Sequence, residues 1–339
     1  MRAHLRTASK VGTLGPFFGE TTRLWHSTLV GSGISVATTD QRSAAKAILY
    51  AFVANFAIAL AKTWAALVTG SGSLLAEAIH SYADSGNQVL LFVGMRQALK
   101  PADREHPLGY GKLTYFWAFI VALLLFSVGG LFSIYEGVHK LQHPEPLNAA
   151  WIGLLVLAVA IVLETFSLLG CLREIGKIRG AKSLRTWLVH TRNAELVVVL
   201  GEDVAAIAGL LLAFVCLGLS VMTGEPTFDA LGSIAIGIVL MTVSIFIAWR
   251  IRSLLVGRSA EPDLVALIDE IIAADPAIEQ LLNSITMQFG PDVMLAAKVR
   301  FDSDLTVNEA VARINALEVR IKQHAPEVRW CFIEPDVTD

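Results

Sequence analysis

The stretch Glu77-Ala-Ile-His80-Ser-Tyr-Ala-Asp84 lies within an apolar segment in the first third of the chain. His80 and Asp84 are four residues apart, so in a helix their side chains lie on one face. Glu77 precedes His80 by three residues and joins that face. The flanking residues are typical of a membrane span, where ionisable side chains are costly and mark functional sites. An imidazole and a carboxylate on one face also form half of a tetrahedral divalent-metal site.

The composition indicates a membrane protein. The chain has 339 residues, of which 54% are hydrophobic and 17% are charged, whereas a soluble domain has about 25% charged residues. The apolar residues also occur in blocks of about twenty, the length that a bilayer span needs. The cysteines show no CxxC spacing, so we expect neither disulfides nor cysteine–metal chemistry; they are Cys171, Cys216 and Cys331.

The apolar blocks predict a six-helix transmembrane domain over residues 44–256. The spans are expected at about residues 44–68, 74–99, 113–140, 149–172, 193–222 and 228–253. Residues 1–43 form a basic segment that we expect to be disordered. That segment fits a mitochondrial transit peptide, a cytoplasmic basic tail or an over-extended start.

Basic residues predict the orientation of the spans. They cluster between spans two and three, after span six, and in a linker over residues 173–192 between spans four and five. By the positive-inside rule, these loops and both termini lie in the cytoplasm, or in the matrix of a mitochondrion. An even number of spans agrees with both termini being on one side.

The residues from 257 to 339 predict a small α+β domain on the cytoplasmic side. Helical periodicity covers 262–273 and 307–323, and strands are expected at 281–289, 293–301 and 328–333. The order αββαβ suggests two layers. A domain of about eighty residues is marginally stable alone and gains from pairing with a second copy, so we expect it to serve as a dimerisation domain.

Taken together, these features resemble the cation diffusion facilitator family of divalent-metal transporters. The motifs are His80-x-x-x-Asp84, the loop Asp103-Arg-Glu-His106-Pro-Leu-Gly109-Tyr-Gly111-Lys112, Glu202-Asp203 on span five, and the αββαβ tail. The phrases at 77–81, 104–111 and 254–259 look most like the branch that contains an animal mitochondrial zinc transporter. The resemblance implies a ferredoxin-like tail, a homodimer, and exchange of metal for protons by alternating access.

The resemblance also implies a metal site with two ligands from span two and two from span five. His80 and Asp84 match the first pair, and Asp203 matches one member of the second. Val199 occupies the remaining position and cannot bind a metal. In order of preference, the candidates for the fourth ligand are Glu202, Glu164 and Glu77, with water as a further option. Glu202 projects about 100° away from Asp203 around the helix, and the carboxyls of Glu77 and Glu164 could instead serve helix packing.

Two accessory features of the family are incomplete in this chain. Asp103 and His106 could hold a peripheral metal, but Tyr110 stands where relatives often have a histidine, which favours a turn or capping role. Lys112 matches a lysine of the family that meets an acidic residue near the end of span six and locks the dimer. That acid is missing at residues 256–258, and Glu261 is the candidate substitute.

We therefore expect a divalent metal transporter and not an enzyme, with zinc leaving the cytoplasm or matrix by proton antiport. The alternative is a transport-inactive scaffold or regulatory protein of the same fold. HExxH, HxxEH and P-loop motifs are absent from the sequence, so neither metalloprotease chemistry nor ATP is expected. We expect no cofactor, with Zn²⁺ as cargo, and membrane lipid but no nucleic acid as a partner. The expected location is the bacterial inner membrane, with the mitochondrial inner membrane as the alternative.

Overall fold

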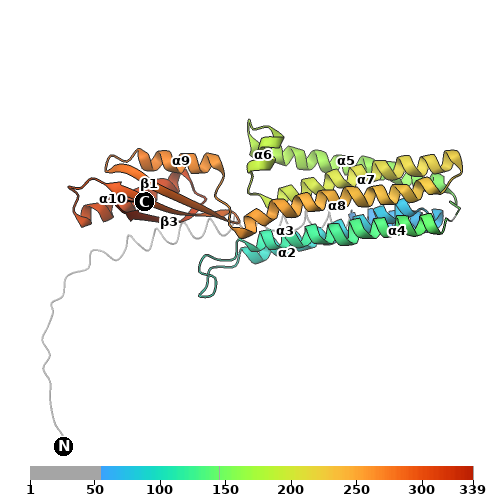
Figure 1. The fold of residues 1–339 in the computed structure, drawn as a ribbon, viewed down its shortest axis with the longest axis horizontal. Helices are drawn as coiled ribbons and strands as arrows, with labels where there is room; N and C mark the ends of the chain where they lie inside the picture. Colours follow the sequence, from blue (N-terminus) through green and yellow to red (C-terminus); the bar gives the residue numbers. More distant parts are fainter. Residues whose placement is uncertain (1–54, 145, 339) are drawn as a thin grey trace, which may run out of the picture. The chain divides into compact units, whose positions relative to one another are not determined.

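The computed structural model describes residues 55–144 and 146–338 (Figure 1). The basic segment 1–43 and the expected start of span one, residues 44–54, lie outside the described residues. A helical segment covers Asn55–Thr69. It is followed by α2 (Gly72–Ala98), α3 (Leu113–Leu124), the π-helix η1 (Leu125–Leu131), α4 (Phe132–Gln142), α5 (Ala150–Arg179), α6 (Leu184–His190), α7 (Ala194–Thr223) and α8 (Thr227–Val256).

Four helices among the described residues are long and apolar enough to cross a membrane. They are Leu113–Gln142, which runs through α3, η1 and α4, together with α5, α7 and α8. These helices agree with the expected spans three to six. The segment Asn55–Thr69 is apolar but shorter, and α2 is long but carries Glu77, His80 and Asp84 on its buried face. Spans one and two therefore stay predictions.

Small residues allow the helices to pack closely. The continuous helix through η1 contacts α8, and a Cβ atom on Gly130 would lie only 3.2 Å from the carbonyl oxygen of Gly237. Such close backbone approach is typical of helix contacts in membranes, where small residues line the interface. Away from these contacts α5 leaves large apolar side chains exposed, among them Trp151, Leu155 and Phe166. This surface suits hydrocarbon better than water.

The start of α2 is held by a carboxylate from α8. Asp229 is buried, and its Oδ2 accepts the backbone N–H of Gly72 at 2.6 Å. Its Oδ1 accepts the hydroxyls of Ser71, at 2.6 Å, and of Ser73. The first N–H groups of a helix lack intrahelical partners and favour negative charge. Asp229 therefore fixes where α2 begins, and so fixes the depth of the face that carries His80 and Asp84.

The tail has the expected order of elements. It contains α9 (Pro262–Ala273), β1 (Ile278–Phe289), β2 (Asp292–Phe301), α10 (Val307–His324) and β3 (Val328–Pro335). Strand β2 is central, antiparallel to β1 and parallel to β3. The predicted alternation of β2 is confirmed, because its inward side chains pack with residues of α9 and α10 in one core; these include Val293, Leu295, Val299, Ile268, Ile272, Leu317 and Ile321.

The linker expected over residues 173–192 is instead mostly helical. Helix α5 continues to Arg179, and the short helix α6 follows. Two signals explain α6. The Ser183 hydroxyl accepts the N–H of Thr186 at 3.1 Å as an N-cap, and Trp187, 3% exposed, packs among Ile175, Val197 and neighbouring apolar residues. The many basic residues of this segment made it look like a loop, although Trp187 is an apolar residue that packs into the core.

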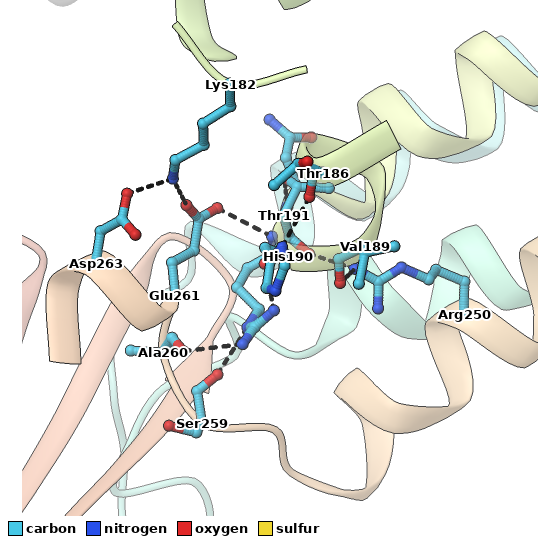
Figure 2. Close-up of polar contacts among 12 residues, drawn as sticks. Lys182, Thr186, Val189, His190, Thr191, Arg250, Ser259, Ala260, Glu261 and Asp263 are labelled. Atoms are coloured by element: carbon cyan, nitrogen blue, oxygen red, sulfur yellow. Dashed lines mark hydrogen bonds and ion pairs between the residues drawn. The ribbon is translucent and has the colours of Figure 1, made fainter. Parts of the chain in front are cut away.

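Arginine side chains cap the end of α6 (Figure 2). The guanidinium of Arg250 on α8 donates to the carbonyl oxygens of Leu188 at 2.9 Å, Val189 at 2.5 Å and Thr191 at 3.1 Å. Arg192 donates to the carbonyl oxygens of His190, Ser259 and Ala260. The last carbonyls of a helix lack intrahelical partners and favour cations. The two arginines thus join α6 to α8 and to the connection between α8 and α9.

Acidic residues at the start of α9 extend this network (Figure 2). Lys182 Nζ lies 2.6 Å from Asp263 and 3.9 Å from Glu261, and the hydrogen bond from Lys182 to Asp263 raises the pKa of Lys182. Burial, with the nearby Arg258, lowers the pKa of Arg192 to about 10. Both arginine and lysine still remain charged near neutral pH.

Glu261, the candidate substitute for the acid opposite Lys112, is engaged elsewhere within the chain, and its place in a dimer contact stays a prediction. The Glu261 carboxylate faces Lys182 and accepts the backbone N–H of Arg192 at 3.3 Å. Lys112 Nζ lies 4.7 Å from the centre of the Phe289 ring, and the described residues give Lys112 no ion pair. Glu261, the first acidic residue after residues 256–258, thus already contacts Lys182 and Arg192, which lie in the connection before α7.

Replacing Arg250 with lysine should destabilise the protein in detergent. A lysine amine cannot reproduce the fork that serves three carbonyls, and each lost bond to a charged donor costs about 1.5–3 kcal/mol. We expect Arg250→Lys to lower the melting temperature by several degrees, whereas Arg252→Lys, an exposed position two residues away, leaves it unchanged. Equal melting temperatures for both variants would show that the arginine cap is dispensable.

Candidate metal site

A small cavity lies among the segment Asn55–Thr69, α2, α5 and α7. Its volume is about 60 Å³, which is more than one water needs. Four carboxyl side chains line it, and they come from three different helices: Asp84, Glu164, Glu202 and Asp203. The remaining lining is mixed, with Asn55, Ile58, Ser81, Gln88, Ser167, Val199 and Ala206. The cavity therefore brings together four ionisable residues from the predicted spans two, four and five.

His80 lies beside this cavity and contacts one of its carboxylates. The distance from His80 Nε2 to Asp84 Oδ2 is 3.4 Å, as expected for residues four apart on one helix face. His80 is fully buried, and within the described residues neither of its ring nitrogens makes a hydrogen bond. Buried polar groups are normally hydrogen-bonded. A buried imidazole whose nitrogens make no hydrogen bonds is available to bind a metal.

On α7 both adjacent carboxyls face the cavity. Asp203 Oδ1 accepts the hydroxyl of Ser167 from α5 at 3.1 Å. Glu202 Oε1 accepts the side-chain amide of Asn87 from α2 at 2.7 Å. This amide turns Glu202 toward α2, which overcomes the angular separation between consecutive helix residues. Val199 also lines the cavity, so an aliphatic side chain fills the position at which the family resemblance implies a ligand.

The other two candidates for a fourth ligand differ in position. Glu164 projects from α5 into the cavity and is part of its lining. Glu77 is not in the lining. Its Oε2 lies 3.2 Å from Nζ of Lys62, and both side chains are fully buried. Glu77 thus already has a cation as its partner.

The carboxyls converge on one cavity without closing around a point. Among residues 55–144 and 146–338, no three His, Cys, Asp or Glu side chains are arranged to hold a metal ion together. The groups that do come together are Asp84, Glu164, Glu202 and Asp203 around the cavity, with His80 against Asp84. Binding a metal among them would require these side chains to come closer together.

The loop residues Asp103 and His106 form a turn. Asp103 Oδ1 accepts the N–H groups of Glu105 at 3.0 Å and His106 at 2.7 Å, and Oδ2 accepts the hydroxyl of Tyr110 at 2.7 Å. The Tyr110 hydroxyl, followed by the His106 N–H, lowers the pKa of Asp103. The His106 imidazole lies 3.6 Å from Asp103, and its ring is tilted by 34° against the ring of Tyr110. Both carboxylate oxygens are occupied, which suits the turn role favoured by the sequence.

Three residues near the cavity were not singled out from the sequence. Asn87 and Ser167 hold Glu202 and Asp203, and Lys62 pairs with Glu77. Lys62 carried a usable signal, since a lysine in the middle of an apolar helix is as unusual as the carboxylates themselves. Asn87 and Ser167 carried none, because polar uncharged residues are common in membrane helices.

Comparisons with known proteins agree with the arrangement of helices. Residues 48–256 match the family model of the cation efflux transmembrane domain. The chain belongs to the cation efflux family. This family, which is the cation diffusion facilitator family, consists of transporters rather than enzymes, and the chain is accordingly a multi-pass membrane protein.

Curated relatives within the cation efflux family cover most of the chain. The mitochondrial proton-coupled zinc antiporter SLC30A9 of Xenopus laevis is 31% identical over 89% of this chain and 61% of its own length. The human SLC30A9 is 32% identical over 80% of this chain and 48% of its own length. The cation-efflux pump FieF of Klebsiella pneumoniae is 27% identical over 84% of this chain and 90% of its own length.

The chain spans about half to three fifths of the length of the SLC30A9 proteins that it matches. These matches confirm the family and its proximity to the animal mitochondrial branch.

Proposed function

We propose that this protein moves a divalent metal ion, with zinc as its main cargo, across a membrane in exchange for protons. The observation that carries the proposal is the cavity lined by Asp84, Glu164, Glu202 and Asp203 with the buried His80 at its edge. So many ionisable groups at membrane depth are too costly to be kept without a function. Relatives named as zinc antiporters and a cation-efflux pump support the same proposal.

The chemistry of the cavity couples metal to protons. Metal ligands must be deprotonated, so a metal entering the cavity displaces protons from imidazole and carboxyl groups, and protons arriving from the other side displace the metal. A site that mixes imidazole with carboxylates suits zinc better than magnesium or calcium. It also accepts cobalt, cadmium, manganese and iron.

The proposed ligands are His80, Asp84 and Asp203, with Glu202 in the fourth position. Glu202 is preferred to Glu164 because it neighbours Asp203 and is already turned toward α2 by Asn87. Glu164 is the second choice, since it enters the same cavity from α5. Glu77 is the third, because its carboxylate is engaged by Lys62.

The larger assembly is part of the same proposal. We place six spans in the membrane over residues 44–256, with Asn55–Thr69 in the first span and α2 as the second. Residues 257–339 form the cytoplasmic dimerisation domain, of ferredoxin-like type. The homodimer is surrounded by lipid, and transport runs outward from the side of the basic loops.

The alternative is a scaffold or regulator that has lost transport. Val199 favours it, because this aliphatic residue occupies a ligand position of the family. The four carboxyls that remain in one cavity favour transport instead. The two functions differ in a direct test of flux.

Zinc flux into proteoliposomes under an imposed pH gradient should depend on the cavity. We expect the wild-type protein to transport zinc, and Asp84→Ala and Asp203→Ala to lose at least about 90% of the flux, because each removes a charged ligand. Asp103→Ala, in the loop, is the matched control and should retain flux.

Survival of transport in both cavity variants would rule out this site. Absence of wild-type transport of zinc, manganese, iron and cobalt would instead favour the scaffold. Dissipating the pH gradient in the wild-type sample separates antiport from a simple channel, since antiport then loses its driving force.

Metal titration in detergent should rank the fourth ligand. We expect Glu202→Gln to weaken zinc binding by about tenfold or more, because an amide oxygen replaces a charged donor, and Glu164→Gln to weaken it less. Glu174→Gln is the control, because Glu174 lies at the exposed end of α5 and pairs with Lys177. A larger loss for Glu164→Gln would assign the fourth position to α5.

A further inference from the structure

Lys62 is a fully buried cation next to the candidate metal site. It projects from the segment Asn55–Thr69, and its ammonium donates to Glu77 Oε2 at 3.2 Å and to the hydroxyl of Ser81 at 2.8 Å. Lys62 and Glu77 are both 0% exposed. Intramembrane lysines are rare, and their partners usually mark the pathway of an ion.

The ammonium lies one hydrogen bond from the cavity wall. Ser81, which accepts from Lys62, is itself part of the cavity lining. On the same helix Asn55 and Ile58 line the cavity, and Lys62 follows Ile58 by four residues on that face. Lys62 therefore sits just beyond one end of the carboxyl cluster, and Glu77 lies on its far side along α2.

A purely structural ion pair is an incomplete explanation for this placement. A buried pair often contributes little net stability, because desolvation of both charges offsets their attraction. Glu77 is also imperfectly satisfied, since its Oε1 has no hydrogen-bond partner within the described residues. A cation at this point does change the potential inside the cavity, where charges are weakly screened.

Resting on the proposed function, we propose that Lys62 is an internal counter-cation of the transport cavity, held back from it by Glu77. Its positive charge balances part of the carboxyl cluster when no metal is bound. The same charge repels a bound divalent ion and so weakens metal affinity enough for release. Glu77 limits this effect by drawing the ammonium toward itself and away from the carboxyls.

The proposal gives opposite signs for the two members of the pair. Without the Lys62 charge, as in Lys62→Met, the cavity should bind zinc roughly tenfold more tightly, since a unit charge near a divalent ion in a poorly screened site is a large effect. In flux assays the same variant should show a lower KM and a lower maximal rate. Glu77→Gln leaves the ammonium free to approach the cavity, and should bind zinc more weakly and raise KM.

The experiment is calorimetric titration of the purified full chain with Zn²⁺ alone, paired with flux in proteoliposomes. Lys62→Met, Glu77→Gln and the double variant are compared with Lys62→Arg, which keeps the charge. The double variant leaves no unpaired buried carboxylate, so it tests the loss of Lys62 even if Lys62→Met fails to fold. It should bind zinc more tightly than the wild type, because the charge nearer the cavity is lost.

The matched control is Lys177→Met together with Glu174→Gln, which removes an exposed ion pair whose charges are 2.6 Å apart. This control should change neither the zinc affinity nor the KM of transport. Unchanged zinc affinity in Glu77→Gln and the double variant would overturn the role of Lys62. A parallel loss of affinity and melting temperature in all variants would do the same and would make the pair structural. Failure of the wild type to bind zinc would refute the proposed function itself, and the role of Lys62 would fall with it.

Discussion

The buried polar groups of α2 must find partners inside the protein, and this requirement organises the helices around it. Unpaired polar groups are costly where no water can reach them. Asp229 of α8 accepts hydrogen bonds from Ser71, Gly72 and Ser73 at the start of α2. Lys62, on the neighbouring segment Asn55–Thr69, forms an ion pair with Glu77 of α2. Further along, Asn87 meets Glu202 of α7. Three neighbours of α2, namely the segment Asn55–Thr69, α7 and α8, thus each contribute a polar side chain to it.

Several buried polar atoms without hydrogen bonds belong to residues of the candidate metal site. Among the described residues they include both ring nitrogens of His80, Asp84 Oδ1 and Asp203 Oδ2. These atoms are nitrogen and oxygen donors of the types that zinc accepts. These unpaired donors support the proposed metal site.

The sequence predicts what depends on local periodicity. The face of α2 that holds His80 and Asp84, the four long spans and the order of strands in the tail all follow from spacings within one segment. Contacts between segments could not be predicted in the same way. The Asn87 amide that redirects Glu202, the capture of Glu261 by Lys182 and the arginine cap on α6 depend on which helices pack together. Helix α6 was missed because its basic residues outweigh the single anchor Trp187.

Val199 lines the cavity at the position where the family resemblance implies a ligand. Helix α7 contributes two carboxyls to the cavity, Glu202 and Asp203, and α5 adds Glu164. A ligand set rich in carboxylates would lower the preference of the site for the softest metals. Among the described residues, His80 is the only imidazole next to the cavity.

X-ray absorption at the zinc edge of the zinc-loaded protein tests the central claim most directly. The account predicts one imidazole and several oxygen donors at about 2.0–2.2 Å, and no sulfur shell at about 2.3 Å. Two or more imidazoles, or any sulfur ligand, would contradict a site built from His80 and the carboxyls of α2, α5 and α7.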